Sequence, residues 1–222
     1  MIRFDSVTKR FPSGTIALRD VSFEIEPGEL VAIVGPSGSG KTTILRLILR
    51  EFPPSEGTIT VNEFSVAKLK QKDIPKLRRS IGAIFQDFKL LEDQTIGENI
   101  GLVLEIAGKS DRDIAGRVLE VLELVHLSDK KDLFPKQLSG GEIQRTAIAR
   151  ALALHPAIIF ADEPTGNLDH ETALEIAAVL KDIHSKGSIV IVATHDDTML
   201  DELNARVLLL REGKLIEKGK KK

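Results

Sequence analysis

The stretch Leu30-Val31-Ala32-Ile33-Val34-Gly35-Pro36-Ser37-Gly38-Ser39-Gly40-Lys41-Thr42-Thr43 decides the fold. Residues 30–34 form a short apolar run, which is the pattern of a strand buried on both faces of a sheet. A glycine-rich turn follows, and apolar residues then recur at helical spacing from Thr42 to Arg50. The stretch therefore predicts a buried parallel strand, a loop and a helix, which together begin an α/β core.

The loop also carries a chemical pattern, because a glycine is followed by four residues and then by Gly-Lys-Thr. Glycines let the backbone curl so that successive N–H groups face phosphate oxygens, and the helix N-terminus adds partial positive charge. In such a phosphate-binding loop (P-loop), Lys41 reaches the β- and γ-phosphates and the Thr42 hydroxyl binds Mg²⁺. We therefore expect a nucleoside triphosphate site formed by Gly35, Pro36, Ser37, Gly38, Ser39, Gly40, Lys41, Thr42 and Thr43.

The rest of the chain predicts one domain with two additions to this core. Alternating apolar residues at 2–7 and 18–25 predict strands of an N-terminal antiparallel β-subdomain. Residues from about 87 to 155 have mostly helical patterns, and apolar strands return after them. The fold class we expect is α/β, a P-loop NTPase core with a mostly parallel sheet. Its core comprises 1–86, with the β-subdomain, and 156–222, and 87–155 form a helical insert subdomain.

Two finer features are predicted near the middle and the end of the chain. Ser110 with Asp113 resembles a capping box at the start of a helix, and apolar residues then follow on one helical face from Ile114 to Val125. The C-terminal run Lys218–Lys222 predicts a solvated basic tail.

Composition excludes several classes of protein. The 222 residues are 42% hydrophobic and 29% charged, which is ordinary for a folded globular chain. The absence of cysteine excludes disulfides and thiolate chemistry, and a net charge of −2 gives no reason to expect a nucleic-acid partner. Because there is no apolar run of about 18 residues, any membrane span must belong to another chain.

A second acidic pattern lies at the end of the apolar run 157–161, where Asp162 and Glu163 follow. Residues just past the carboxyl end of a parallel strand face the crevice in which ligands bind. Asp162 is then placed to hold Mg²⁺, and Glu163 to orient or deprotonate an attacking water.

The segment Leu138-Ser139-Gly140-Gly141-Glu142 predicts a second anion site. Ser139 is a helix cap, and Gly140 and Gly141 expose N–H groups at the N-terminus of the following helix. One nucleotide does not need two γ-phosphate cradles in one chain. We therefore predict that the second cradle serves a nucleotide held by another subunit.

These motifs together resemble the ATP-binding cassette family over nearly the whole chain. Leu138, Ser139, Gly140, Gly141 and Glu142 match its signature motif, which binds ATP of the partner subunit. Further matches, in chain order, are Phe11 (stacking on adenine), Gln86 (contacting Mg²⁺ and linking the site to the helical subdomain), Asn167, Leu168 and Asp169 (the D-loop) and His195 (the switch at the γ-phosphate). The resemblance implies an ATP-hydrolysing enzyme with ATP and Mg²⁺, catalytic residues Glu163, His195, Gln86 and Lys41, and metal ligands Thr42, Gln86 and Asp162. It also implies an ATP-dependent head-to-tail dimer with a second copy.

The branch of the family is indicated by Asp162–Asp169, which resembles lipoprotein-release, macrolide-exporter and cell-division ATPases. The opening Met1–Phe4, the segment Ile74–Gly82 and the segment Phe85–Leu91 are most similar to the cell-division members. That resemblance implies an integral membrane subunit as partner and a peripheral place on the cytoplasmic face of a bacterial plasma membrane. The alternatives are an exporter or lipoprotein-release ATPase, or a cassette ATPase of DNA repair or translation.

The surface that meets the membrane subunit is expected near Phe88, Leu90 and Leu91. An apolar cluster there has two interpretations, a docking surface or the core between the subdomains.

Overall fold

The computed structural model describes residues 1–166 and 168–220. Its strands are β1 (Ile2–Arg10), β2 (Ile16–Ile25), β3 (Leu30–Val34), β4 (Glu56–Val61), β5 (Phe64–Ser65), β6 (Ile81–Ile84), β7 (Ile158–Asp162), β8 (Ile189–Thr194), β9 (Arg206–Arg211) and β10 (Lys214–Lys220). Its α-helices are α1 (Lys41–Ile48), α2 (Ile74–Arg79), α3 (Ile96–Ile106), α4 (Asp111–Leu124), α5 (Gly140–Leu152), α6 (His170–Ser185) and α7 (Asp197–Leu203). Short 3₁₀ helices are η1 (Val66–Lys68), η2 (Gln71–Asp73), η3 (Ser128–Lys130) and η4 (Pro135–Gln137).

The strands form two sheets, and both agree with the expected fold class. One sheet is antiparallel, in the order β2-β1-β4-β5. The other has the order β10-β9-β3-β8-β7-β6, and β9, β3, β8, β7 and β6 are parallel neighbours. Because β3 lies between β8 and β9, its carboxyl end and that of β8 meet at one edge of the sheet, where ligands of α/β proteins bind.

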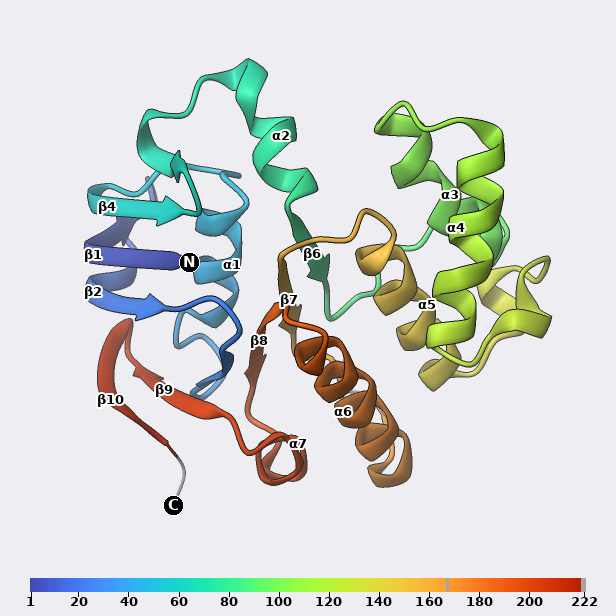
Figure 1. The fold of residues 1–222 in the computed structure, drawn as a ribbon. Coiled ribbons are helices and arrows are strands. Elements are labelled where there is room, and N and C mark those ends of the chain that lie inside the picture. The colour runs from blue at the N-terminus through green and yellow to red at the C-terminus, as the bar shows by residue number, and fades with distance from the viewer. Residues whose placement is uncertain (167, 221–222) are drawn as a thin grey trace.

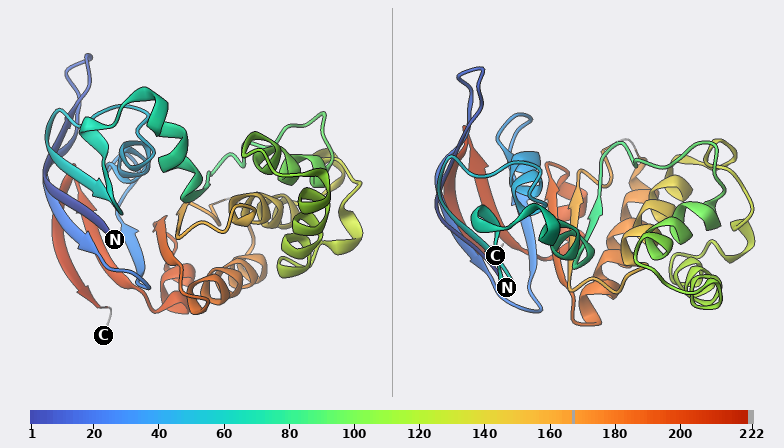
Figure 2. Two further views of the ribbon diagram at one scale, coloured as in Figure 1. Left: turned by 45° about the horizontal axis from the view of Figure 1, so that its top comes forward. Right: turned by 90° about the horizontal axis from the view of Figure 1, so that it is seen from above.

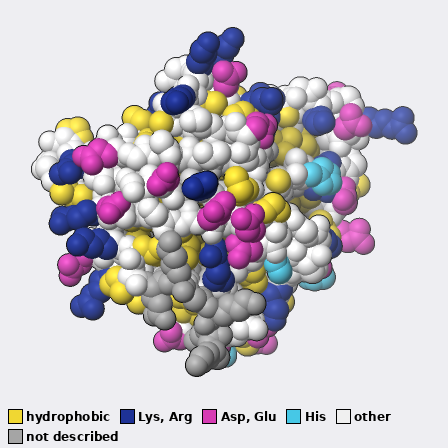
Figure 3. All heavy atoms as spheres, turned by 60° about the vertical axis from the view of Figure 1, so that its left-hand side comes forward, with side chains coloured by type: hydrophobic (Ala, Val, Ile, Leu, Met, Phe, Trp, Pro, Cys, Tyr) yellow, Lys and Arg dark blue, Asp and Glu magenta, His cyan; other side chains and the backbone are white. Residues whose placement is uncertain are grey.

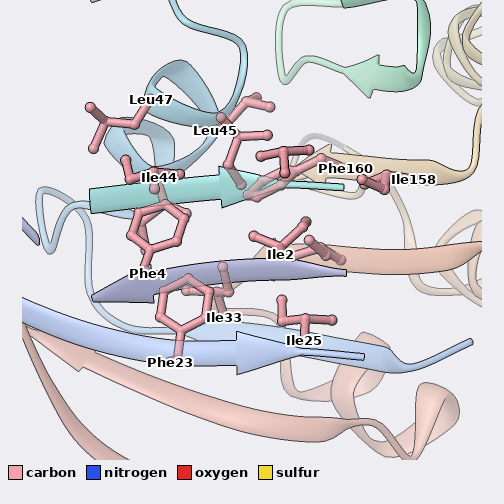
Figure 4. Close-up of a cluster of buried hydrophobic side chains, with 14 of the residues drawn as sticks. Ile2, Phe4, Phe23, Ile25, Ile33, Ile44, Leu45, Leu47, Ile158 and Phe160 are labelled. Carbon is pink, nitrogen blue, oxygen red and sulfur yellow. The ribbon is translucent and has the colours of Figure 1, made fainter. Parts of the chain in front are cut away.

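The first core lies between the two sheets and around α1. Phe4 of β1 and Phe23 of β2 stack with ring centroids 4.5 Å apart, and Ile44 and Leu45 of α1 are buried in the same cluster as Phe160 of β7 (Figure 4). Each fully buried side chain of this size stabilises the fold by about 1.5–3 kcal/mol relative to exposure. Helix α1, and with it the P-loop, is therefore fixed on the inner face of the parallel sheet.

The second core lies on the opposite face of the parallel sheet. Alternate residues of a strand point to opposite faces, so Phe160 joins the first core whereas Ile159 and Ala161 join the second. Helices α3 to α7 cover that face. Figure 1 and Figure 2 show α3, α4 and α5 as a lobe on the side of the molecule away from β1, β2 and β4. We call α3, α4 and α5 the helical lobe.

Two local predictions have different outcomes. The predicted capping box of α4 is confirmed for Ser110, whose hydroxyl accepts a hydrogen bond from the Asp113 N–H, but the Asp113 carboxylate accepts from that hydroxyl at 2.7 Å and not from the Ser110 N–H. The solvated tail was wrong for 218–220, since Lys214–Lys220 pairs antiparallel with β9 at the edge of the sheet. Backbone pairing with β9 outweighs the low strand propensity of a lysine-rich segment, and 221–222 lie outside the described residues.

Candidate active site

The P-loop joins β3 to α1, and its glycines are required by close backbone contacts. A Cβ on Gly35 would lie 2.1 Å from the carbonyl oxygen of Leu210, and a Cβ on Gly40 would lie 2.6 Å from that of Ala17. Gly40 also has φ = 112°, a left-handed conformation that other residues rarely adopt. Gly40 is the N-cap of α1 and makes no side-chain cap hydrogen bond, so the first N–H groups of α1 have no side-chain cap. This is the arrangement that binds anions at helix N-termini.

Lys41, the first residue of α1, has an almost fully buried side chain. Its Nζ donates hydrogen bonds to the carbonyl oxygens of Gly35 at 2.7 Å and Pro36 at 3.3 Å. The same ammonium group lies 3.0 Å from Oε1 of Glu163. Its positive charge is thus held inside the loop by two carbonyl dipoles and one carboxylate.

Glu163 stands between Lys41 and His195. It follows β7, has φ = 48°, and anchors its N–H on the carbonyl of Ala193 in β8 at 2.8 Å. Its Oε2 lies 2.9 Å from Nδ1 of His195, which follows the end of β8. A left-handed glutamate costs backbone energy, and such strain is concentrated at functional sites. The three parallel strands β3, β7 and β8 thus bring together a cation, a carboxylate and an imidazole that the sequence places far apart.

Asp162, the last residue of β7, is buried beside this cluster. Burial raises the pKa of its carboxyl, and the nearby Glu163 charge raises it further, whereas a hydrogen bond from Thr42 opposes the shift. Its Oδ1 is buried and has no hydrogen-bond partner among the residues that the structure describes. A buried carboxylate oxygen without a donor, next to a threonine hydroxyl, has the chemistry of a hard-cation ligand set. The residues therefore fit Mg²⁺.

Gln86 lies on the loop that follows β6, next to the turn after Glu163. A Cβ on Gly166 would be 3.7 Å from Nε2 of Gln86 and 3.8 Å from Cβ of Glu163. The turn is fixed from its other side by Thr165, whose hydroxyl donates to Oδ2 of Asp196 at 2.8 Å. Thr165 and Asp196 have no predicted role, although Asp196 directly follows the predicted switch histidine. They join the turn after β7 to the turn after β8.

Phe11 belongs to a different cluster. Its half-buried ring makes an edge-to-face contact with Phe52, the centroids being 5.3 Å apart. The ammonium of Lys9 lies 4.4 Å from the centre of the Phe52 ring and 5.2 Å from that of Phe11. The structure thus places Phe11 in an aromatic cluster just after β1. This cluster is separate from the one formed by Lys41, Glu163 and His195.

The predicted signature forms the N-terminus of α5 in the helical lobe. The Ser139 hydroxyl accepts from the Glu142 N–H, while Glu142 Oε2 accepts from the Ser139 N–H at 2.8 Å, which is a complete capping box. Lys130 forms an ion pair with Glu142. Hydrogen bonds from Lys130 and Ser139 lower the pKa of Glu142 to about 2. Leu138 is half-buried against the second core, so the motif is rigidly mounted.

The predicted D-loop lies directly against this helix end. Cβ atoms on Gly140 and Gly141 would be 3.2 Å from Cδ2 of Leu168 and 2.5 Å from Cγ2 of Thr172. Asp169 caps α6, accepting the Thr172 N–H at 2.9 Å and the Thr172 hydroxyl at 2.7 Å. Asn167, the first residue predicted for this loop, lies outside the described residues.

The two helix ends with anion-binding character lie in different parts of the chain. The first, at Lys41, belongs to α1 in the core between the sheets. The second, at Gly140, belongs to the helical lobe (Figure 2). The first is surrounded by the reactive carboxylates and the second is not.

Arg150 of α5 has a structural role that the sequence did not reveal. Its guanidinium donates to the carbonyl oxygen of Phe88 at 2.6 Å and to that of Lys89. Phe88 and Lys89 have φ values of 57° and 54°, which side-chain-bearing residues seldom adopt. Burial lowers the pKa of Arg150. The loop after Gln86 is thus clamped to the helix that carries the signature, at the two residues whose backbone is left-handed.

Comparison with known proteins identifies the class. The sequence model of the ABC transporter family matches residues 18–166. The chain belongs to this family and is an ATP-binding cassette ATPase.

Individual relatives show which members of the family this chain is similar to. The chain is 45% identical over 216 residues to the cell division ATP-binding protein FtsE of Streptococcus pneumoniae, covering 97% of this chain and 94% of that protein. It is 44% identical over 215 residues to FtsE of Escherichia coli, covering 97% of each. Among solved structures, the dimeric post-hydrolysis state of the ATP-binding cassette MJ0796 bound to ADP and Pi matches with a TM-score of 0.91 at 37% identity, covering 99% of this chain and 98% of that one.

Proposed function

We propose that this chain hydrolyses ATP as the nucleotide-binding subunit of an FtsE-like complex that drives a membrane protein in bacterial cell division. The observation that carries the proposal is Glu163, whose two carboxylate oxygens contact Lys41 and His195 at 3.0 and 2.9 Å. The 45% identity to cell-division ATPases over nearly the whole chain supports the branch.

In the mechanism, the phosphates of ATP compete for the Lys41 ammonium. Lys41 now binds Gly35, Pro36 and Glu163, and a γ-phosphate of higher charge displaces these contacts. Glu163 is then released from Lys41 and accepts a proton from the attacking water. His195, two-thirds exposed at the rim, is held by Glu163 where it can donate to the γ-phosphate or position the water.

The metal ligands are Thr42, Gln86 and Asp162. Mg²⁺ held by them would supply positive charge to the β- and γ-phosphates as negative charge develops on the transferred group. Phe11 would stack on the adenine base, since a phenyl ring offers a flat apolar face.

The complete site would require a second copy of the chain in a two-fold, head-to-tail dimer. Leu138–Glu142 of one protomer would close on the ATP held by the P-loop of its partner, because α5 presents N–H groups and a helix dipole there. The dimeric MJ0796 cassette is a structural precedent for such an assembly.

Two experiments test this site. Glu163→Gln keeps the shape of the side chain but removes the base, so it should accumulate an ATP-bound dimer on size-exclusion chromatography with little turnover. The matched control is Glu63→Gln, an exposed residue of the β-subdomain. Turnover of Glu163→Gln at the native rate would refute the catalytic role.

The second experiment asks whether the site is shared. Lys41→Ala and Ser139→Arg should each abolish hydrolysis when alone. Mixing the two variants should restore part of the activity, because one intact P-loop then meets one intact signature. If both motifs served one ATP within a chain, the mixture would remain inactive.

The membrane partner would be an FtsX-like subunit at the cytoplasmic face of the plasma membrane. Within the described parts of the chain, no helix has the length and apolar character to cross a bilayer. A groove of about 520 Å³ runs between α2, α3 and α5. Its walls include Phe85, Leu91 (41% exposed) and Ile106 (70% exposed), so an apolar surface is open to a partner.

One of the three predicted docking residues lines this groove, and the other two lie beside it in the same loop. Leu91 lines the groove, and Phe88 and Leu90 are half-buried in the same loop. This exposure favours docking over the alternative of core packing between subdomains. Leu90→Glu should abolish co-purification with the membrane subunit while sparing nucleotide binding. Retained co-purification would show that the docking site lies elsewhere on the chain. The identity of the captured membrane subunit would distinguish a role in cell division from a role in export.

A further inference from the structure

A strongly basic segment lies beside the groove, and neither the nucleotide site nor the fold accounts for it. Residues 68–79 contain six basic side chains and one acidic one, a net charge of +5, whereas the whole chain carries −2. We call the basic residues Lys68, Lys70, Lys72, Lys76, Arg78 and Arg79 the basic rim. All six are exposed.

The segment is folded, so its charges are displayed on a fixed surface. Val66 of η1 and Ile74 and Leu77 of α2 are buried and anchor it to the core. Arg78 Nε also donates to the carbonyl oxygen of Leu49 at 3.0 Å. Because Val66, Ile74 and Leu77 point inward, the rim side chains are exposed on the outer side of η1, η2 and α2, and Arg78 is in addition held by its Nε.

The basic rim carries charges that the described part of the chain does not neutralise with ion pairs. Among the described residues none of the six forms an ion pair, although surface pairs occur elsewhere, as at Arg10–Glu56 and Lys181–Glu202. Ordinary protein surfaces intersperse both signs of charge. Figure 3 shows Lys and Arg side chains at the top of the molecule, the end at which Figure 1 places α2. A single-sign surface of this kind attracts a polyanion.

The position of the basic rim indicates that the polyanion it binds is the surface of a lipid bilayer. Arg78 and Arg79 line the same groove as Phe85 and Leu91, so the rim borders the proposed docking surface. A membrane subunit that enters the groove brings its bilayer to this side of the chain. We propose that the basic rim binds the anionic lipid headgroups of the cytoplasmic leaflet and orients the ATPase against the membrane. The membrane-facing orientation rests on the proposed function, but the lipid affinity itself does not.

The expected strength follows from simple electrostatics. Each Lys or Arg close to an anionic membrane contributes favourable free energy to membrane binding. Removing three of them should therefore weaken partitioning onto the membrane about a hundredfold. The attraction is screened over a Debye length of about 10 Å at 0.1 M salt and about 3 Å at 1 M. Binding should therefore be lost in high salt.

The test is sedimentation of the purified full-length chain with vesicles, without any membrane subunit. Vesicles of phosphatidylglycerol and phosphatidylethanolamine are compared with vesicles of phosphatidylcholine alone. The variant Lys68→Gln, Lys70→Gln, Lys72→Gln removes three rim charges. The matched control, Lys109→Gln, Arg112→Gln, Lys136→Gln, removes three exposed charges from other parts of the surface.

We expect the native chain and the control to sediment with anionic vesicles only, and the rim variant to lose about two orders of magnitude in partitioning. Equal binding to neutral vesicles, equal loss in both variants, or no binding by the native chain would overturn the proposal. Binding to DNA or to an acidic peptide in place of anionic vesicles would overturn it too. ATPase activity of all three proteins, measured in parallel, checks the proposed function separately, since the substituted lysines, Lys68, Lys70 and Lys72, are not among its nucleotide-site residues.

Discussion

Substituting each of the two glycines at the start of α5 with alanine should affect the free energy of unfolding differently. Gly140→Ala and Gly141→Ala add the same methyl group to consecutive residues of one helix. At Gly140 the new Cβ would lie 3.2 Å from the tip of Leu168, a flexible side chain that can move by a few tenths of an ångström. At Gly141 it would lie 2.5 Å from Cγ2 of Thr172, which is closer than real Cβ contacts.

Thr172 cannot turn aside without losing other interactions. Its hydroxyl donates to Asp169 at 2.7 Å, and its N–H donates to the same carboxylate at 2.9 Å. Overpacking of this kind costs about 1–3 kcal/mol, and disturbing an N-cap costs about 1 kcal/mol. Alanine in a helix instead gains about 1 kcal/mol over glycine. We therefore expect Gly141→Ala to lower the free energy of unfolding by about 1–3 kcal/mol and Gly140→Ala to leave it unchanged or slightly raised.

A second-site change tests the cause. Thr172→Ser removes Cγ2 but keeps the hydroxyl that binds Asp169, so Gly141→Ala combined with Thr172→Ser should recover most of the lost stability. Urea unfolding of the four proteins gives the coupling energy directly. The reasoning is refuted if Gly141→Ala is as stable as the native chain, or if Thr172→Ser does not rescue it.

Three further predictions concern charged residues. Because burial raises the pKa of Asp162, its carboxylate form destabilises the folded state at neutral pH. Asp162→Asn should therefore raise the urea midpoint while abolishing Mg²⁺-dependent ATP hydrolysis. A lower midpoint would contradict the destabilisation expected from the buried carboxylate. The pKa of Glu142 falls from 4.5 to about 2 on folding, so its contribution is complete above pH 4.5 and is lost as the pH falls through about 2. The stability gap between the native chain and Glu142→Gln should close over that range, and a gap that is constant with pH would exclude the Lys130 ion pair as its source. Arg150→Lys should cost about 1–3 kcal/mol, because one ammonium replaces a guanidinium that binds two carbonyls, and an unchanged urea midpoint would show that the clamp is not needed.

The sequence predicted elements whose pattern is local. The runs 30–34 and 158–162 are apolar on both faces, because both faces of the parallel sheet are covered. The cap at Ser110 needs only residues within one turn of helix. Such features depend on neighbours along the chain, which a sequence displays directly.

Features that depend on distant partners could not be predicted in the same way. Lys214–Lys220 is a strand because β9 offers an unpaired edge, not because its residues favour strands. Arg150 binds carbonyls of a loop about sixty positions earlier, and the need for it comes from two left-handed residues. Thr165 and Asp196 meet only because β7 and β8 are neighbours in the sheet. These contacts depend on the order in which strands pair and on local backbone conformation, and residue types alone do not determine either.

The contact between Lys41 and Glu163 links nucleotide binding to proton transfer in the proposed mechanism. A buried ammonium and a buried carboxylate stabilise each other, and separating them without a substitute costs several kcal/mol. While Lys41 contacts Oε1 of Glu163, that oxygen is engaged by the ammonium, and in the proposed mechanism it accepts from water only after this contact is broken. In the proposed mechanism a γ-phosphate replaces Glu163 as the partner of Lys41, and Nδ1 of His195 still contacts Oε2 of Glu163. In the proposed mechanism the nucleotide thereby frees Glu163 to act as the base for its own hydrolysis, and Lys41 and Glu163 pair with each other until the nucleotide binds.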